Sequence, residues 1–358
     1  MNVRLEKLIK LVKDKNADAA LLLNESNMHY ACGFSPSEGA VLITASGEGY
    51  HLVDSRYTET AVNHAKKSGL KVIEINKSFT DEIRDLCLQY SVKNILFENE
   101  TISFSAYNKY REILEGIEFT GLDNSIMELR NVKDIDEIEM MKKANNIAEK
   151  SFQELLNEVK PGKSERELAA LFDYIMAKNG SHGVSFDTIL LTGTHTSMPH
   201  GVPDDRLIQD GDFVLFDFGA TYCGYHSDMT RTVAVGHATD EMADAYNLVL
   251  KAQKAGIKAL GDGVRCADVY QAAYDVLQEK DMGKYFRHSL GHGVGLDIHE
   301  GYNASPKSND TFTVGNVTSI EPGIYIPDKF GIRIEDLLYI SPRGRENFSK
   351  ITKELIIL

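Results

Sequence analysis

Two aspartates interrupt a β-prone stretch, "VLFDFGATYCGYHSDMTRTV", which runs from Val214 to Val233. Its apolar arms around a glycine-containing centre predict a β-hairpin. Asp217 falls within one arm, and Asp228 lies near the start of the other. An ionised carboxylate is costly to bury without a partner. The pair therefore raises the question of what cation lies between the two arms.

Further candidate ligands occur later in the chain. Glu321 lies in "SIEPGIYIP" and Glu335 in "GIRIEDLLYI", both apolar and β-prone, and His292 lies in the glycine-framed "GHGVG". Taken singly, a strand Asp can pair with an arginine, a strand Glu can face solvent, and a lone His can be a hydrogen-bonded core residue. Together, the four carboxylates outnumber the nearby cations Arg231 and Arg333. Oxygen ligands with one imidazole suit a pair of manganese, cobalt, zinc or iron ions, which lie about 3.5–4 Å apart and activate a water.

Length and composition restrict the class of protein. With 358 residues, the chain exceeds the usual size of a single core and predicts two domains. A net charge of −14 argues against binding to nucleic acid or to an anionic membrane surface. The four scattered cysteines form no CxxC pair and indicate free thiols in the cytoplasm. The charged N-terminal stretch predicts neither a signal peptide nor a transmembrane span.

The first part of the chain, residues 1–125, predicts a small α/β domain with a mixed sheet. An amphipathic helix with Leu5, Leu8, Ile9 and Val12 precedes the strand "AALLL", and "GAVLIT" and "YHLVD" predict a hairpin. Three more strands are expected at "KVIEI", "NILFE" and "IEFTGL", with helices at residues 81–90 and 105–114. The segment "DSRYTET", residues 54–60, predicts a helix start with an Asp or Ser cap.

The second part, residues 126–358, predicts a larger α+β domain. A helix is expected to begin at Asp134 and to end at "KPG", and Ser164 with Glu167 predicts a capping box for the next helix, which Gly180 ends. Helices at residues 240–259 and 267–280 repeat this layout, and a glycine-rich strand region follows. The faint duplication predicts a pseudo-two-fold domain in which helices cover one side of a curved sheet.

Five segments resemble the successive signatures of the pita-bread metallopeptidases, especially the Xaa-Pro group of aminopeptidase P and prolidase. They are "SFDTILLTGTHTSMPHG", "DFGATYCGYHSDMTRTV", "HSLGHGVGLDIHE", "SIEPGIYIP" and "GIRIED". In the first half, "NMHYACGF" and "DSRYTE" resemble that group's creatinase-like N-terminal domain, so the likeness spans nearly the whole chain. It implies a curved antiparallel sheet, two divalent ions per chain (Mn²⁺ first, Co²⁺ or Zn²⁺ as alternatives) and a homodimer. By position, the dinuclear metal ligands are Asp217, Asp228, His292, Glu321 and Glu335.

The same resemblance implies roles for residues around the metals. His200 matches a histidine that touches the scissile carbonyl or the developing oxyanion, and His299 one that contacts the substrate on the other side. His288 matches a residue that walls the proline pocket, and Arg333 an outer-shell arginine. Glu321 matches a metal ligand that also carries a proton. The implied reaction is attack on the amide by a hydroxide shared by the metals, with proton transfer to the prolyl nitrogen.

One departure bears on the substrate. After "HE", many members of this group have a proline and many prolidases then have an arginine, whereas this chain has Tyr302 and Asn303. Without that arginine, recognition of a dipeptide carboxylate is in doubt. The sequence therefore favours an Xaa-Pro aminopeptidase that acts on peptides with proline at the second position. The alternative is an Xaa-Pro dipeptidase (prolidase) restricted to dipeptides.

Other classes fit the sequence less well. A metal-free hydrolase like creatinase lacks this ligand set, and methionine aminopeptidase lacks the N-terminal domain. A non-catalytic pita-bread binding protein is disfavoured by the intact ligands. The segment "GHGVG" is not a dinucleotide-binding loop, because it lacks GxGxxG spacing and the expected βαβ setting.

Overall fold

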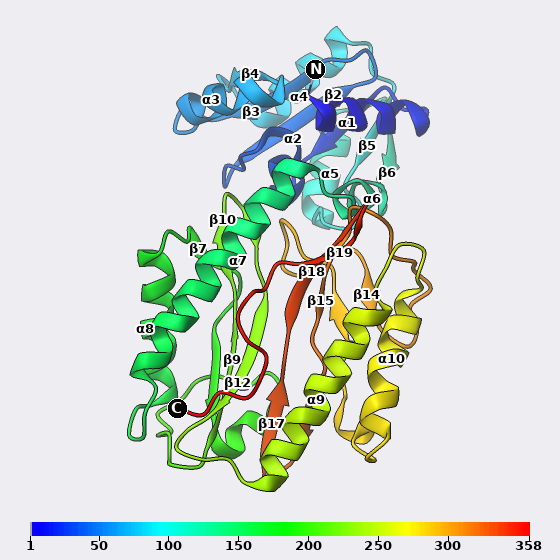
Figure 1. Ribbon diagram of the computed structural model, residues 1–358. Coiled ribbons are helices and arrows are strands. Elements are labelled where there is room, and N and C mark those ends of the chain that lie inside the picture. The colour runs from blue at the N-terminus through cyan, green and yellow to red at the C-terminus, as the bar shows by residue number, and fades with distance from the viewer. Residues whose placement is uncertain (1) are drawn as a thin grey trace. The chain divides into compact units, whose positions relative to one another are not determined.

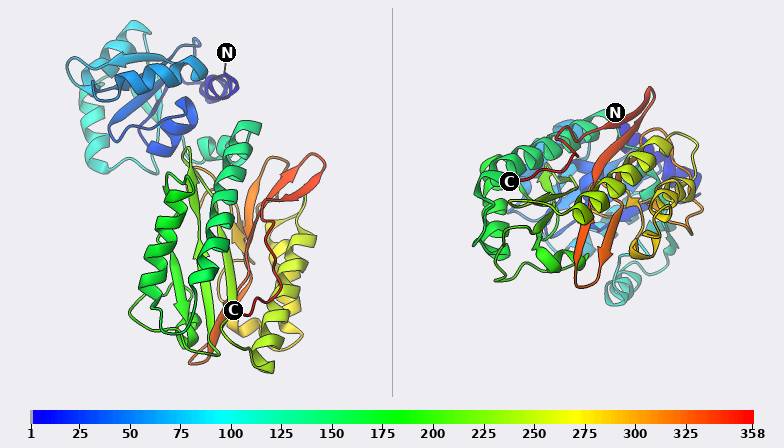
Figure 2. Two further views of the ribbon diagram at one scale, coloured as in Figure 1. Left: turned by 60° about the vertical axis from the view of Figure 1, so that its left-hand side comes forward. Right: turned by 60° about the horizontal axis from the view of Figure 1, so that its bottom comes forward.

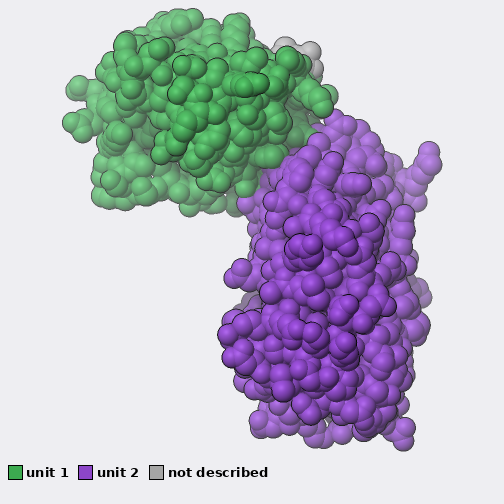
Figure 3. Space-filling model, turned by 90° about the vertical axis from the view of Figure 1, so that its left-hand side faces the viewer, with its two compact units in different colours: residues 1–130 green, residues 131–358 purple. Residues whose placement is uncertain are grey.

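The computed structural model describes residues 2–358. The chain divides into two compact units, residues 1–130 (unit 1) and 131–358 (unit 2), which Figure 3 shows in separate colours. The predicted domain boundary at residues 125 and 126 falls at the first turn of α6 (Ser125–Asn131), and it stays a prediction.

Unit 1 is built on one mixed sheet of six strands, in the order β4-β3-β2-β1-β5-β6. The strands β1–β3 are antiparallel neighbours, whereas β4, β5 and β6 join by parallel pairing. All six predicted strands are therefore present, including the hairpin of β2 with β3. The strands are β1 (Ala19–Leu22), β2 (Gly39–Thr44), β3 (Gly49–Val53), β4 (Lys71–Glu74), β5 (Asn94–Phe97) and β6 (Glu118–Gly121).

The helices of unit 1 bury their apolar faces on this sheet, and Leu5, Leu8, Ile9 and Val12 are all buried as predicted. The predicted cap at residues 54–60 is wrong. The helix there begins at Thr58 after Tyr57, which makes no side-chain cap, and the Asp54 carboxylate instead accepts a hydrogen bond from Arg56 Nε at 3.0 Å. Besides α6, the helices are α1 (Val3–Asp14), α2 (Glu25–Cys32), α3 (Thr58–Ser68), α4 (Phe79–Gln89) and α5 (Phe104–Ile113).

Unit 2 contains two helix pairs, α7 (Ile135–Leu155) with α8 (Glu165–Lys178) and α9 (Asp240–Ala259) with α10 (Cys266–Gln278). Each pair packs in a separate apolar core, and Figure 1 shows the two pairs over different halves of the strands. Asp134 and Glu137 form a capping box at the start of α7. Ser164 caps α8 by accepting from the Glu167 backbone N–H, but the predicted capping box is incomplete because the Glu167 carboxylate binds Lys163 instead. The repeated helix–helix–sheet layout of the prediction is therefore present.

The strands of unit 2 form short antiparallel sheets, in the orders β12-β9-β8, β11-β10-β7, β15-β18-β19, β13-β14 and β16-β17. The first half contains β7 (Gly183–Val184), β8 (Ile189–Thr192), β9 (Phe213–Phe218), β10 (Ala220–Tyr222), β11 (Tyr225–His226) and β12 (Met229–Ala234). The second half contains β13 (Gly291–His292), β14 (Asn303–Ala304), β15 (Val317–Ile320), β16 (Gly323–Ile326), β17 (Phe330–Arg333), β18 (Asp336–Ser341) and β19 (Gly344–Asn347). Short 3₁₀ helices lie at Leu156–Glu158, Gly193–Ser197 and Gly283–Tyr285.

The final residues of unit 2 run extended beside β12, as Figure 2 shows. Ala234 N–H donates to the carbonyl of Ile356 and its own carbonyl accepts from Leu358 N–H, both at 2.9 Å. The Arg231 guanidinium donates to the Thr352 carbonyl at 3.1 Å. This segment therefore pairs with the outer edge of β12. No helix among residues 2–358 is long and apolar enough to cross a bilayer.

Candidate metal centre

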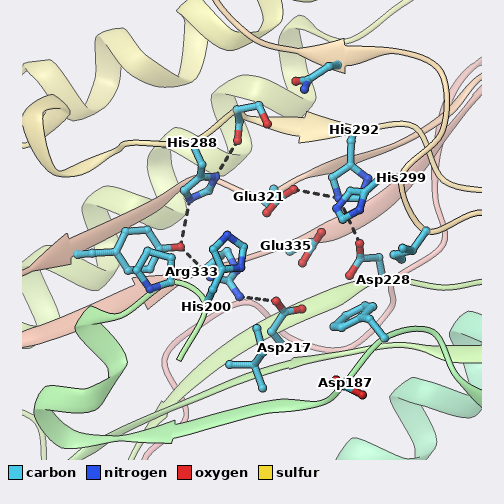
Figure 4. A pocket seen from close by; sticks show the side chains of 17 residues that line it. Asp187, His200, Asp217, Asp228, His288, His292, His299, Glu321, Arg333 and Glu335 are labelled. Carbon is cyan, nitrogen blue, oxygen red and sulfur yellow. Dashed lines mark hydrogen bonds and ion pairs between the residues drawn. The ribbon is translucent and has the colours of Figure 1, made fainter. Parts of the chain in front are cut away.

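Unit 2 encloses a cavity of about 580 Å³, and Figure 4 shows it from close by. Its walls come from both halves of the unit, and every candidate site residue of the sequence lines it. These residues are His200, Asp217, Asp228, His288, His292, His299, Glu321, Arg333 and Glu335.

The predicted hairpin positions the two aspartates. β9 pairs with β12 from Phe213 opposite Ala234 to Phe218 opposite Met229. The turn between the arms, at Cys223 and Gly224, has φ values of 49° and 79°, which a tight two-residue hairpin turn requires. Asp217 lies within β9, and Asp228 directly precedes β12. Both carboxylates therefore reach the cavity from neighbouring strands.

Glu335 joins them from the second half of unit 2. It lies between β17 and β18, and its backbone N–H donates to the carbonyl of Thr230 in β12 at 3.1 Å. The Thr230 hydroxyl donates to Glu335 Oε2 at 2.7 Å, and the glutamate is only 1% exposed. The sequence places Glu335 inside a strand, but the structure places it at a break between two strands, where its side chain is free to turn inward.

His292 and Glu321 complete the cluster. His292 Nε2 lies 3.4 Å from both Asp228 Oδ2 and Glu321 Oε1. Glu321 directly follows β15, where Pro322 interrupts the apolar run, and its Oε1 accepts from the Ser319 hydroxyl at 3.1 Å. Asp228, His292 and Glu335 each offer a ligand atom, and these atoms all lie within 4.8 Å of one another.

Among residues 2–358, one arginine faces these carboxylates. Arg333 donates to Asp217 Oδ2, to the Tyr325 hydroxyl at 2.7 Å and to the Thr230 hydroxyl at 3.0 Å. Arg231 instead binds Asp336 at 2.8 Å and the Glu335 carbonyl at 2.5 Å. A single guanidinium therefore faces four carboxylates, which agrees with the shortage of cations expected from the sequence.

The pKa values of the cluster reflect this excess of negative charge. Burial, against the opposing charge of Arg333 and together with the charge of Asp217, raises the pKa of Glu321 to about 8. Burial and the neighbouring carboxylates also raise the pKa values of Asp228 and Glu335 well above their ordinary range. Burial lowers the pKa of His292 to about 4. Without a cation, Glu321 therefore keeps its proton near neutral pH and the His292 imidazole is neutral.

The cluster also leaves acceptor atoms unused. Asp217 Oδ1 and Glu335 Oε1 are buried and have no hydrogen-bond partner among the described residues. A buried polar atom without a partner costs about 1–3 kcal/mol. Unused carboxylate oxygens beside a neutral imidazole are the donors that divalent cations such as Mn²⁺ and Zn²⁺ take in proteins. The residues present therefore fit a divalent-cation centre.

Three further histidines surround the cluster. His299 stacks edge-on against His292, with 4.2 Å between ring centroids, and both His299 and His200 are exposed within the cavity. His288 Nε2 lies 3.1 Å from the Tyr325 hydroxyl, and burial lowers the pKa of His288 to about 3. His200 and His299 can therefore donate to a bound molecule, whereas His288 forms part of a wall.

A second acidic group lies in the support of this site. Glu165, in the first turn of α8, is fully buried and accepts hydrogen bonds from Thr192 N–H at 2.7 Å, His195 Nδ1 at 2.8 Å and Asp204 N–H at 3.0 Å. These donors lie on either side of His200. One carboxylate therefore holds both ends of the loop that carries His200 into the cavity.

The sequence interpretation missed several of these residues. Glu165 appears in the sequence only as a first-turn acid, and Tyr325 only as one aromatic residue in an apolar run. Asp187 lies within the quoted segment "SFDTILLTGTHTSMPHG" but was given no role there, yet it lines the cavity. Asn303, noted only for its substrate role, pairs with His292 in the β13–β14 ladder and also lines the cavity.

Comparisons with known proteins agree with this geometry. Residues 139–342 match metallopeptidase family M24, and residues 4–132 match the creatinase/prolidase N-terminal domain. The chain is 36% identical over 356 residues to an Xaa-Pro dipeptidase of Pyrococcus furiosus, covering 99% of this chain and 100% of the relative.

Two solved structures are similar over nearly the whole chain. One is an Xaa-Pro dipeptidase from Bacillus anthracis, with a TM-score of 0.94 and 35% identity over 99% of each chain. The other is an X-Pro aminopeptidase from Thermotoga maritima, with a TM-score of 0.92 and 33% identity, covering 98% of this chain and 100% of the other. The predicted fold is confirmed: a mixed-sheet α/β domain precedes a pita-bread domain. This chain therefore belongs to metallopeptidase family M24.

Proposed function

We propose that the protein is an Xaa-Pro dipeptidase that uses two divalent cations. The observation that carries the proposal is the cluster of four carboxylates and one histidine, with unused buried oxygens, that lines one cavity in a metallopeptidase chain. The dipeptidase of Pyrococcus furiosus and that of Bacillus anthracis support this specificity. The homodimer and the cytoplasmic location expected from the sequence stay predictions.

The proposed metal ligands are Asp217, Asp228, His292, Glu321 and Glu335. Bound there, two cations would lower the pKa of a water molecule and polarise the scissile carbonyl. Mn²⁺ is the first ion to test, with Co²⁺ and Zn²⁺ as alternatives, because oxygen ligands with one imidazole suit all three.

The protein's own groups have separate tasks around the scissile bond. Arg333 holds Asp217 in place, and Thr230 and Ser319 orient Glu335 and Glu321 through their hydroxyls. Glu321 lies beside His292 in the cluster, and we assign it the transfer of a proton to the prolyl nitrogen during the reaction.

The substrate is held by the surrounding histidines. His200 and His299 donate hydrogen bonds to the substrate, and His200 donates to the carbonyl oxygen where negative charge develops. His288, the Tyr325 ring and Arg333 together form the wall against which the proline ring packs. The nonpolar edge of this wall suits an imide ring, which has no N–H to satisfy.

A second candidate function, an Xaa-Pro aminopeptidase acting on longer peptides, is favoured by Asn303. An asparagine amide can donate to a continuing chain as well as to a carboxylate. The X-Pro aminopeptidase of Thermotoga maritima is also similar over nearly the whole chain. We place this function second because two relatives that are 36% and 34% identical, from Pyrococcus furiosus and Pyrococcus horikoshii, are named Xaa-Pro dipeptidases.

One set of rate measurements tests both the metal and the substrate length. Chelation should abolish hydrolysis of Ala-Pro, and Mn²⁺ or Co²⁺ should restore it. The dipeptidase should then cleave Ala-Pro-Ala with a kcat/KM below about one hundredth of that for Ala-Pro, a difference of about 2.7 kcal/mol. Comparable rates for the two peptides would establish the aminopeptidase instead. Full activity in a metal-free, chelator-resistant enzyme would exclude both.

A further inference from the structure

The cavity has two chemically different ends. Figure 4 shows His288 at one end and Asp187 at the other, with Asp217, Asp228 and Glu335 between them. Under the proposed function, the proline ring packs at the His288 end and the scissile bond lies at the carboxylates. The side chain of the residue before proline then extends toward Asp187.

Apolar side chains line this cavity together with one carboxylate that has no partner among residues 2–358. Phe186, Ile189 and Ile298 line the cavity together with Asp187. The Asp187 side chain is exposed and makes no hydrogen bond or ion pair with any residue from 2 to 358. Each of the other carboxylates of the cavity contacts Arg333, His292 or a hydroxyl group. Asp187 differs from them because its carboxylate contacts no such group among residues 2–358.

The backbone on both sides of Asp187 is anchored, which fixes the position of this carboxylate. Ser185 N–H donates to the Gly219 carbonyl at 2.9 Å and the Ser185 hydroxyl to the Ala220 carbonyl at 3.0 Å. On the other side, the Thr188 hydroxyl donates to Asp173 at 2.6 Å. A charged group on an anchored segment can recognise a ligand with little loss of conformational entropy.

The electrostatics at this end favour a cation. Asp173 lies close enough for the charge of Asp187 to add to the effect of burial in raising the pKa of Asp173. The one arginine that lines the cavity, Arg333, is committed to Asp217 and Tyr325. Negative charge at the Asp187 end is therefore not balanced by any lysine or arginine among the lining residues.

We propose that Asp187 makes this enzyme prefer substrates with a cationic residue before proline, that is, Lys-Pro and Arg-Pro. The aliphatic part of a lysine or arginine side chain packs on Phe186, Ile189 and Ile298, and its charged end meets the Asp187 carboxylate. This inference rests on the proposed function, because it needs the proline ring at the His288 end. It names Asp187 as a specificity-determining residue.

A cationic substrate and its neutral isostere test the proposal with the metal-loaded, full-length enzyme. Citrulline has the shape of arginine without its charge, so the kcat/KM ratio of Arg-Pro to citrulline-Pro isolates the charge effect. For the wild-type enzyme we expect a ratio of about five, the size of one partly solvated ion pair. The ratio should fall toward one when the salt concentration rises from about 0.05 M to about 0.5 M.

Asp187→Asn should reduce the ratio to about one, because the amide keeps the size of the side chain and removes its charge. The control, Asp205→Asn, removes an exposed acid that does not line the cavity and should keep the wild-type ratio. The ratio is the readout because general damage to the enzyme lowers both rates together. An unchanged ratio in Asp187→Asn would overturn the inference, whether or not the two rates fall together.

The same assay separates this inference from the proposed function. If the wild-type enzyme hydrolyses Ala-Pro but shows no preference for Arg-Pro over citrulline-Pro, only the inference is wrong. If the metal-loaded enzyme hydrolyses no Xaa-Pro dipeptide, the proposed function is wrong and the inference falls with it.

Discussion

Unit 2 contains two groups of nearly identical chemistry: Glu165 with His195 and Asp204, and Asp228 with His292 and Glu335. In each, a histidine and two carboxylates bring ligand atoms within 4.8 Å of one another. They differ in what their oxygens already bind. The Glu165 oxygens accept from two backbone N–H groups and an imidazole, whereas Glu335 Oε1 has no partner among residues 2–358.

This difference distinguishes the Glu165 group, which stabilises a loop through hydrogen bonds, from the Asp228 group, which can bind metal. The Glu165 group has its acceptor capacity filled by the protein, and it lies outside the lining of the cavity. The Asp228 group opens into the cavity with unused acceptors and an excess of negative charge. Residue types and proximity are therefore not sufficient to identify a metal site, and the hydrogen bonds that each oxygen already accepts decide the matter.

The largest expected effect comes from removing a charge in the Asp228 group. Glu335→Gln should lose bound metal and lower kcat/KM by about 10³-fold or more, because several kcal/mol of charge stabilisation are lost. Asp228→Asn should behave in the same way. Elemental analysis and kinetics measure both effects, and Glu165→Gln is the matched control. Equal metal loss in Glu165→Gln would contradict the distinction between the two groups.

A smaller effect is expected from the histidines that face the substrate. His200→Ala and His299→Ala should each retain metal but lower kcat by about 10²–10³-fold, the usual cost of one transition-state donor. Measured metal content separates them from the ligand variants. A wild-type kcat in either variant would identify that histidine as a packing residue.

The Glu165 group should act on the reaction only through the position of His200. Glu165→Gln places an amide N–H₂ against the donors of this group, so we expect a loss of about 1–3 kcal/mol in stability. A small displacement of His200 should lower kcat about tenfold, since 1 Å can cost about 100-fold. Metal content should not change. Glu167→Gln, an exposed substitution in the same helical turn, is the control for both measurements.

The smallest expected effect is a pH dependence of stability in the metal-free protein. The folded state raises the pKa of Glu321 from its ordinary value of 4.5 to about 8, so it binds more protons than the unfolded state between these values. Stability therefore falls as pH rises through this range. His292 and His288 act in the opposite direction only below about pH 6.5, because their folded pKa values are about 4 and about 3.

Thermal unfolding between about pH 6.5 and 8 measures this effect. The contribution of Glu321 should fall by about 1.6 kcal/mol over the range, because one group contributes a slope of at most about 1.4 kcal/mol per pH unit. Saturating Mn²⁺ should remove the slope, because the ion replaces the protons on the carboxylates. Glu321→Gln should also reduce the slope. A slope that is equal with and without metal would show that the cluster carries no excess protons.

Much of the fold follows from local sequence patterns. The six strands of unit 1 and the capped helices α7 and α8 each have a local signal, and the predicted bounds of α9 agree with the structure. The hairpin at residues 214–233 is predictable because the apolar pattern of its two strands and the residues of its turn all lie within twenty residues of sequence. The cap at residues 54–60 was not, because the Arg56 guanidinium competes for the Asp54 carboxylate.

The residues of the site could be predicted from the sequence, but the hydrogen bonds between them could not. Carboxylates in apolar surroundings stand out in a sequence, so Asp217, Glu321 and Glu335 are visible there. The shared hydroxyl of Thr230 is not visible, because it depends on β12 lying beside Arg333 and Glu335 from about 100 residues further along the chain. The hydrogen bonds that Glu165 accepts from both ends of the His200 loop also join residues distant in the sequence, so they are not visible there either.

The extended segment beside β12 has a consequence for solution behaviour. An uncovered strand edge offers unpaired N–H and C=O groups to any other chain, which promotes aggregation. In this protein, residues 356–358 occupy that edge at Ala234 and Gly236. Proteolytic loss of this segment would expose the edge next to the buried Val233 and Val235. We therefore expect clipped molecules to self-associate while their helix content is still intact.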